Sequence, residues 1–159
     1  WLPILALLCL GNILYCGLVA MRQKDLNLLI GNSSVAHMGF VFLGIASVTT
    51  IGLTGAVMVM VAHGLLAGLA FGLSGYLYSQ ARTLDMEKLQ GLLASMPFWG
   101  TLMIMALMAG CGLPGFANFA GELTVFFGAW KVYPVITSIG IRSALVIGAV
   151  NMLRAIRTL

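Results

Sequence analysis

Charged residues are scarce in this sequence. Lysines and arginines number 8 and acidic residues 4, so charged residues make up 8% of the chain and hydrophobic residues 61%. Soluble domains carry about a quarter charged residues, whereas the mean hydropathy here is +1.07. The composition excludes an ordinary soluble domain and predicts an integral membrane protein in contact with the lipid bilayer.

Cysteine is rare as well, and its spacing matches no metal-binding pattern. Cys9, Cys16 and Cys111 all lie in apolar segments, and no C-x-x-C pair occurs. The spacing therefore gives no sign of a disulfide framework, a zinc site or an iron–sulfur site. We interpret the three cysteines as small apolar residues of helices.

A basic segment is missing before the first apolar run, which begins next to Trp1. A signal peptide would carry such a segment. We therefore expect an internal piece of a longer chain.

Long apolar runs dominate the rest of the sequence. A helix needs about 20 apolar residues to cross the hydrocarbon core. Simple spans are predicted near residues 2–21, 26–48, 53–79 and 132–153. Because no internal repeat or linker divides them, we expect one transmembrane bundle over residues 1–159.

The apolar run at 96–131 is too long for one straight span, since as a helix it would measure about 50 Å. Gly112, Pro114 and Gly115 lie in its middle. Proline removes a helical hydrogen bond, and glycine tolerates unusual backbone angles. We predict a discontinuous helix broken at 110–115, and hence an all-α, polytopic bundle of about five spans.

Basic residues fall almost entirely on one side of this topology. Lys131 is predicted on one side, and the opposite loops and tail hold Arg22, Lys24, Arg82, Lys88, Arg154 and Arg157. The positive-inside rule makes the second side cytoplasmic. This bias explains the net charge of +4, so we expect no nucleic-acid partner.

Three glycines recur at every fourth position of the third predicted span, at Gly64, Gly68 and Gly72. Such a spacing lines one face of a helix with small residues and lets a neighbouring backbone approach closely. We predict that this glycine stripe packs against another helix.

Titratable residues inside the predicted spans are the candidate functional groups. His37 and His63 each lie about ten residues into a span, and Glu122 lies about nine residues before Lys131, so all three fall near mid-membrane. Ionisable residues at that depth are costly and often form ion or proton pathways. A histidine there can also be neutral helix-to-helix glue, and a buried glutamate must be neutral or paired.

Arg142 is a further charge in the middle of the last predicted span. It could pair with Glu122, extend its side chain to the membrane surface, or face another subunit. The sequence leaves these alternatives open.

Several segments resemble a known family. They are "SSVAHMGF" around His37, "AHGL" around His63 and "GLPGFANFAGELTVFFGAW" at 112–130. In this order they are similar to the antiporter-like membrane subunits of respiratory complex I. Within these, the resemblance is greatest to the subunit M family of bacterial NADH:quinone oxidoreductase, also known as the NADH dehydrogenase subunit 4 family. It implies that these spans form the C-terminal half of a longer chain.

The resemblance implies roles for the candidate residues. His37 and His63 would belong to a central proton relay, and Glu122 would be its terminal proton site in the broken helix. Gly112, Pro114 and Gly115 would shape the break. Sister subunits usually carry lysine at the position of Glu122, so glutamate favours the subunit M family.

The resemblance also implies partners and a location. No catalytic residue, cofactor or metal is expected in this chain; NADH, FMN, iron–sulfur clusters and quinone would bind to partner subunits. Other complex I membrane subunits, the lipid bilayer and protons are the expected partners. We expect the bacterial inner membrane, with an organellar inner membrane as the alternative.

Two other functions stay open. A subunit of a multisubunit sodium/proton antiporter, or of a membrane-bound hydrogenase, shares these motifs and often has lysine at the position of Glu122. A structural membrane subunit, whose histidines only join helices, is the alternative from another class.

Overall fold

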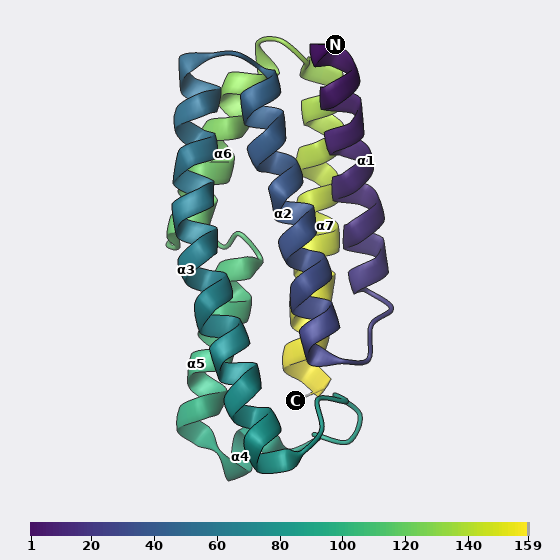
Figure 1. Cartoon of the computed structure of the whole chain (residues 1–159), viewed down its shortest axis with the longest axis vertical. Coiled ribbons are helices and arrows are strands. Elements are labelled where there is room, and N and C mark those ends of the chain that lie inside the picture. The colour runs from purple at the N-terminus through teal and green to yellow at the C-terminus, as the bar shows by residue number, and fades with distance from the viewer. Residues whose placement is uncertain (159) are drawn as a thin grey trace.

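Helices account for nearly the whole chain. The computed structural model describes residues 1–158, except for the side chains at 93 and 94, and these residues form seven helices and no β-strand. In order they are α1 (Leu2–Ala20), α2 (Leu26–Ala46), α3 (Thr50–Ala81), α4 (Leu92–Ser95), α5 (Pro97–Gly110), α6 (Ala117–Trp130) and α7 (Pro134–Thr158). The long helices run side by side along one axis (Figure 1). The predicted all-α bundle is confirmed.

Membrane-spanning length is reached by four helices among the described residues. By length and composition, α1, α2, α3 and α7 could each cross a bilayer, and α5 is a shorter apolar helix. The shorter helices α5 and α6 follow one another along α3, with a loop between them at mid-height (Figure 1). This pair is the predicted discontinuous helix.

The loop between α5 and α6 has a local cause. Gly112 and Gly115 have φ angles of +70° and +111°, in the left-handed region that glycine alone adopts readily. Pro114, between them, cannot donate a backbone hydrogen bond. The helix therefore ends at Gly110 and restarts at Ala117.

Polar caps begin two of the long helices. The Asp25 carboxylate accepts a hydrogen bond from the Leu28 amide at 3.1 Å, and the Thr49 hydroxyl accepts one from the Gly52 amide at 3.0 Å. Each cap satisfies a backbone amide that the first turn of a helix leaves free. The caps therefore set the depth at which α2 and α3 begin.

The closest helix contact joins α3 to α6, and glycines make it possible. A Cβ atom at Gly55 would lie 2.5 Å from the backbone nitrogen of Val125, and one at Gly121 would lie 2.9 Å from that of Val59. At Gly128 a Cβ atom would meet the backbone of Gly52. The two backbones therefore touch along most of α6.

The predicted glycine stripe plays no such part within this chain. Gly64, Gly68 and Gly72 are exposed, and within the described residues nothing lies within 4 Å of a Cβ atom built at any of them. The prediction that this face packs against another helix of the chain was wrong. Glycine spacing shows that a close approach is possible, but it does not show which face of a helix has a partner.

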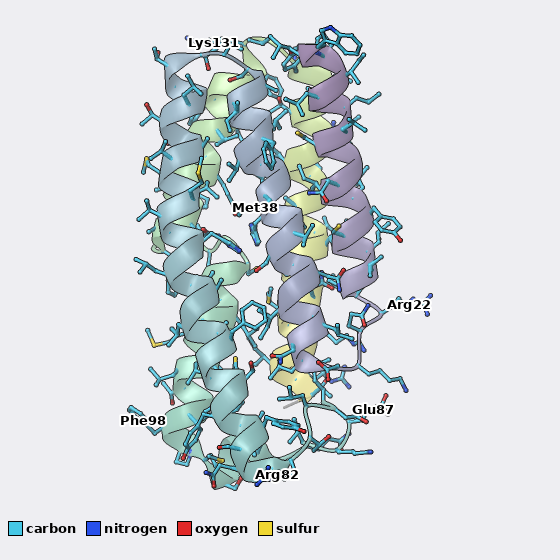
Figure 2. All side chains as sticks on the ribbon, in the orientation of Figure 1. Arg22, Met38, Arg82, Glu87, Phe98 and Lys131 are labelled. Atoms are coloured by element: carbon cyan, nitrogen blue, oxygen red, sulfur yellow. The ribbon has the colours of Figure 1, made fainter. Side chains whose placement is uncertain are left out.

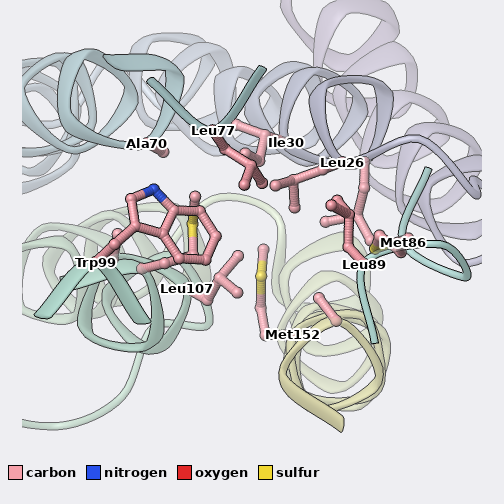
Figure 3. Packing of buried hydrophobic residues seen from close by; sticks show 13 residues of the cluster. Leu26, Ile30, Ala70, Leu77, Met86, Leu89, Trp99, Leu107 and Met152 are labelled. Carbon is pink, nitrogen blue, oxygen red and sulfur yellow. The ribbon is translucent and has the colours of Figure 1, made fainter. Parts of the chain in front are cut away.

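The largest cluster of buried apolar residues lies toward the end of the bundle that holds the basic loops. One cluster joins α2, α3, α5 and α7 to the loop before α4 (Figure 3). Its members include Leu26, Leu77, Met86, Trp99, Leu107 and Met152. The Trp99 indole also donates to the Leu73 carbonyl at 2.9 Å. This cluster holds α5 against α3.

Labelling from the two sides of the membrane checks the predicted sidedness. Arg82 lies at one end of the bundle and Lys131 at the other, and Arg22 lies in the half of the bundle that ends at Arg82 (Figure 2). We expect single cysteines at positions 22 and 82 to react only from the cytoplasmic side, and one at 131 only from the opposite side. A membrane-impermeant thiol reagent, applied to intact cells and to inverted vesicles, measures this.

The labelling needs a background in which the three native cysteines are replaced by alanine. Gly52 is a poor alternative probe for the outer end, because it is buried and a side chain there would meet the Gly44 carbonyl at 2.8 Å. Reaction of position 82 from outside intact cells would overturn the assigned sidedness.

Candidate functional site

His37 is a residue of α2 whose side chain faces the helix break and α6. Its Nδ1 is 2.9 Å from Oε1 of Glu122, and its Nε2 is 2.9 Å from the carbonyl oxygen of Gly110. Both side chains are buried, with exposed fractions of 11% for His37 and 9% for Glu122. The sequence predicts His37, His63 and Glu122 at one depth, and the fold brings His37 and Glu122 into direct contact.

The carbonyl of Gly110 is available because of Pro114. In a continuous helix, a carbonyl accepts from the amide four residues later. Here the residue at that position is Pro114, which has no amide hydrogen. The break therefore leaves a buried acceptor free, and the His37 ring satisfies it.

Proton positions at His37 follow from its two neighbours. A carbonyl oxygen only accepts, so Nε2 carries a hydrogen and donates it to Gly110. Nδ1 faces the Glu122 carboxyl group at 2.9 Å. With one proton between them, the pair is either imidazolium with carboxylate or neutral imidazole with carboxylic acid, and these two forms interconvert by one proton transfer.

Alignment within the pair is incomplete. The 2.9 Å separation is an ion-pair distance, but Nδ1 of His37 does not meet the angle of a regular hydrogen bond. Proton transfer is efficient only along a well-aligned donor and acceptor. A rotation of the imidazole or of the carboxyl group would bring the two atoms into line.

His63 lies on α3, beside His37. The two ring centroids are 5.0 Å apart, and Nε2 of His63 is 3.0 Å from the hydroxyl oxygen of Ser34. Its Nδ1 has no hydrogen-bond partner among the described residues. A cavity of about 20 Å³ borders both rings and Ser33 and Ser34, which is room for one water molecule.

Two residues near Glu122 shape its surroundings. Nδ2 of Asn118, one turn earlier on α6, is 3.4 Å from Oε1 of Glu122. Gly112 lies against the other oxygen, since a Cβ atom there would be 2.8 Å from Oε2. Glycine is therefore required at position 112 for two reasons: the backbone has a positive φ there, and the Glu122 carboxyl group occupies the space that a side chain would fill. Pro114 and Gly115 are exposed in the loop.

Arg142 is not part of the site. Its side chain is exposed on α7, and its Nε donates to the Ser138 carbonyl at 3.2 Å. Of the alternatives left open by the sequence, a pair with Glu122 is excluded in this structure. The base beside Glu122 is His37, from another helix.

Sequence reasoning missed three members of the site, Ser34, Asn118 and Gly110. The role of Gly110 could have been found, because Pro114 is four residues later. The contact of Ser34 with His63 joins two helices and has no sequence signal. Within residues 1–158, no group of three or more His, Cys, Asp or Glu side chains is placed to hold a metal ion.

Comparison with known proteins identifies the family. Residues 1–148 match the family described as "NADH:quinone oxidoreductase/Mrp antiporter, TM". The chain belongs to this family. NADH-quinone oxidoreductase subunit M of Pseudomonas aeruginosa is 43% identical over 134 residues, which cover 84% of this chain and 26% of that protein.

Two further comparisons support the same family assignment. An NAD(P)H-quinone oxidoreductase chain 4 from a Synechococcus species is 44% identical over 126 residues, covering 79% of this chain and 24% of that protein. A chain in the structure of Thermus thermophilus respiratory complex I with bound NADH matches with a TM-score of 0.94 and 31% identity, over 99% of this chain and 33% of that one.

The resemblance to complex I antiporter-like subunits is therefore confirmed, and the chain is an integral membrane protein of that family. It spans about a quarter of the length of the curated relatives it matches.

Proposed function

We propose that this chain is part of a proton-translocating membrane subunit of an NADH:quinone oxidoreductase. The observation that carries the proposal is the contact of His37 with both the freed Gly110 carbonyl and the Glu122 carboxyl group. The contact joins a buried base and a buried acid at the point where the spanning helix is broken.

In the proposed mechanism a proton leaves a ring nitrogen of His63, passes through one water molecule and bonds to Nδ1 of His37, because Nε2 already carries the hydrogen that it donates to Gly110. The proton then passes to Glu122. In the last step the N–H bond at Nδ1 breaks, an O–H bond forms on Oε1, and imidazolium and carboxylate become imidazole and carboxylic acid. The pair has no net charge before or after this step, so no isolated buried charge is created. Glu122 then releases the proton along the break toward the outer side, which leaves a carboxylate beside a neutral imidazole until the next proton arrives from His63.

The break supports this role through its backbone. Irregular backbone at membrane depth is tolerated where it is buried in protein or lines a water-filled cavity. Gly112 lies directly against Glu122, while Leu113, Pro114 and Gly115 are exposed. The loop thus connects the buried Glu122 carboxyl group to the exposed surface of this helix bundle.

Partners and cofactors follow from the family. Relatives are named as subunits of NADH-quinone and NAD(P)H-quinone oxidoreductases, so we propose that NADH, FMN, iron–sulfur clusters and quinone bind to partner subunits. Quinone reduction there would drive proton transfer here, next to other antiporter-like membrane subunits. The Pseudomonas relative supports a bacterial inner membrane. The family description also names Mrp antiporters, so a sodium/proton antiporter subunit is the second candidate.

Substitution of the histidines tests the relay. We expect His37→Gln, which keeps a donor for the Gly110 carbonyl but cannot be protonated near neutral pH, to lower proton pumping by about tenfold or more, because a positioned acid or base contributes ~10²–10⁴-fold. Pumping by the assembled complex in vesicles, per NADH oxidised, is the measurement. NADH oxidation with a water-soluble acceptor controls for assembly.

Normal pumping by a variant with glutamine at both 37 and 63 would contradict the relay and favour histidines that only join helices. Sodium-dependent transport by the wild-type complex would instead favour the antiporter candidate.

A further inference from the structure

Arg142 on α7 has no acidic partner among the described residues. None of the ion pairs within residues 1–158 includes it. The sequence contains 4 acidic residues, and one of them, Glu122, is buried against His37. The other three, at positions 25, 85 and 87, belong to the segments before α2 and before α4, at the end of the bundle that holds the basic loops. An anion for this arginine can therefore come only from outside the described residues.

The depth of Arg142 follows from the register of α7 against α1. Both helices run from the outer end of the bundle toward the end that holds the basic loops (Figure 1). A Cβ atom at Gly140 would lie 4.0 Å from Cδ1 of Leu10. One at Gly17 would lie 2.8 Å from Cγ2 of Ile147. In both contacts the α7 residue is 130 positions after the α1 residue, so Arg142 is level with the twelfth residue of the chain.

That level is near the middle of α1. With 19 residues α1 measures about 28 Å, close to the thickness of the hydrocarbon core. The arginine side chain turns toward the outer end, because its Nε donates to the Ser138 carbonyl at 3.2 Å. Ser138 is level with Leu8, which is still about 9 Å below the start of α1. The guanidinium group of Arg142 therefore stays within the depth of the hydrocarbon core.

Arg142 also faces away from the bundle, in a stripe of exposed residues on α7. Residues three or four positions apart lie on one side of a helix, and the exposed residues of α7 follow that spacing. They include Val135, Ile139, Arg142, Val146, Val150 and Leu153. We call these six residues the α7 face. An apolar stripe at this spacing is what one helix offers to another helix, and here its middle holds a charge.

Lipid would suit the apolar residues of the α7 face but not its arginine. Charged side chains at membrane depth are costly, and they face protein or water, where they pair with one another. A guanidinium group binds a carboxylate through two parallel hydrogen bonds, and arginine is enriched at interfaces between proteins. Within this chain the close contact of α3 with α6 uses glycines, whereas the α7 face has branched side chains and a charge. The α7 face therefore has the character of a contact between subunits.

We propose that the α7 face binds a transmembrane helix of a neighbouring membrane subunit, and that this helix carries an aspartate or glutamate opposite Arg142. The carboxylate accepts hydrogen bonds from the guanidinium group, and the apolar residues of the α7 face pack against the same helix. The inference rests on the proposal that this chain is part of a subunit of a larger complex, but not on the proton relay.

Substitution of Arg142 separates a protein partner from lipid. Arg142→Leu leaves the partner's carboxylate buried without a cation, and Arg142→Glu adds a second negative charge opposite it. We expect the yield of assembled complex to fall several-fold for the leucine variant and further for the glutamate variant. Arg142→Lys keeps the positive charge and should retain most of the yield. An arginine that faces lipid or water does not need its charge for assembly, so a normal or higher yield of Arg142→Leu would overturn the inference.

Arg157→Leu is the matched control. Arg157 is exposed on the same helix and lies in its last turn, about 10 Å beyond the level at which α1 ends. The substitution removes the same charge outside the hydrocarbon core, so the complex should assemble normally. An equal loss in Arg157→Leu would overturn the inference, because it would assign the effect to the total charge of the chain.

A photoreactive residue on the α7 face identifies the partner. We would place p-benzoylphenylalanine at position 146, one turn from Arg142, illuminate the assembled complex and identify the cross-linked peptides by mass spectrometry. We expect a peptide from a membrane helix of another subunit, with Asp or Glu within one turn of the cross-linked residue. Cross-links to lipid alone, or to a helix of the same subunit, would overturn the assignment. Arginine at that acidic position should restore the yield lost in Arg142→Glu, and failure to restore it would overturn the ion pair.

Assembly and pumping separate this inference from the proposed function. Normal yield of Arg142→Leu, together with lost pumping in Glu122→Gln, would remove the partner helix and leave the relay standing. Lowered yield of Arg142→Leu, together with normal pumping by Glu122→Gln, would support the partner helix and remove Glu122 as the proton carrier.

Discussion

Replacement of Glu122 by glutamine should stop or strongly reduce proton pumping while the complex still assembles. Glutamine keeps the shape of the side chain and its capacity for hydrogen bonds, but it does not exchange a proton near neutral pH. It can therefore no longer receive a proton from Nδ1 of His37, which lies 2.9 Å from a carboxylate oxygen of Glu122. NADH:quinone activity should fall as well where electron transfer is tightly coupled to pumping.

Glu122→Asp refines this expectation. The shorter side chain keeps the titratable group but withdraws it from Nδ1 of His37, so pumping should be intermediate between wild type and the amide variant. Proton uptake and release by reconstituted vesicles, with quinone reduction followed in parallel, measure both variants.

Glu87→Gln provides the matched control for the charge change. Glu87 forms an ion pair with Lys24 at 3.0 Å, but both side chains are largely exposed, and such surface pairs contribute little. The control should pump normally. If Glu122→Gln also pumped and turned over normally, Glu122 would not be an obligatory proton site, and the histidines would have to work without it.

Substitution of Gly128 should have the largest effect on assembly. A Cβ atom at this position would meet the backbone of Gly52, and backbone cannot move aside as a flexible side chain can. We expect Gly128→Ala to separate α6 from α3 and to destabilise the bundle by about 1–3 kcal/mol or more. The yield of assembled complex and its thermal midpoint are the measurements.

Gly64→Ala is the matched control, since Gly64 is exposed on α3 and no described residue lies within 4 Å of the added methyl group. Alanine is the better helix former by roughly 0.5–1 kcal/mol. The control should therefore assemble as well as the wild type. Equal losses from the two substitutions would show that the stripe at Gly64 has a partner outside this chain.

Local chemistry made much of this protein predictable from its sequence. Pro114 lacks an amide hydrogen, and Gly112 and Gly115 adopt positive φ angles, so the break follows from the residues that form it. The depths of His37 and Glu122 follow from the helical rise and the thickness of the bilayer. These are properties of single residues or of one helix, and they do not depend on a partner.

Contacts between helices were decided by the tertiary structure alone. The partner of Glu122 is His37 of α2, not Arg142, and the glycines that meet a backbone are Gly55, Gly121 and Gly128, not the regular stripe on α3. Spacing along one helix shows what lies on one face of it, but the rotation and register of each helix depend on all the surfaces that it packs against. The rotation of each helix therefore decides which basic side chain a buried acid meets. It also decides which glycines face a neighbouring backbone.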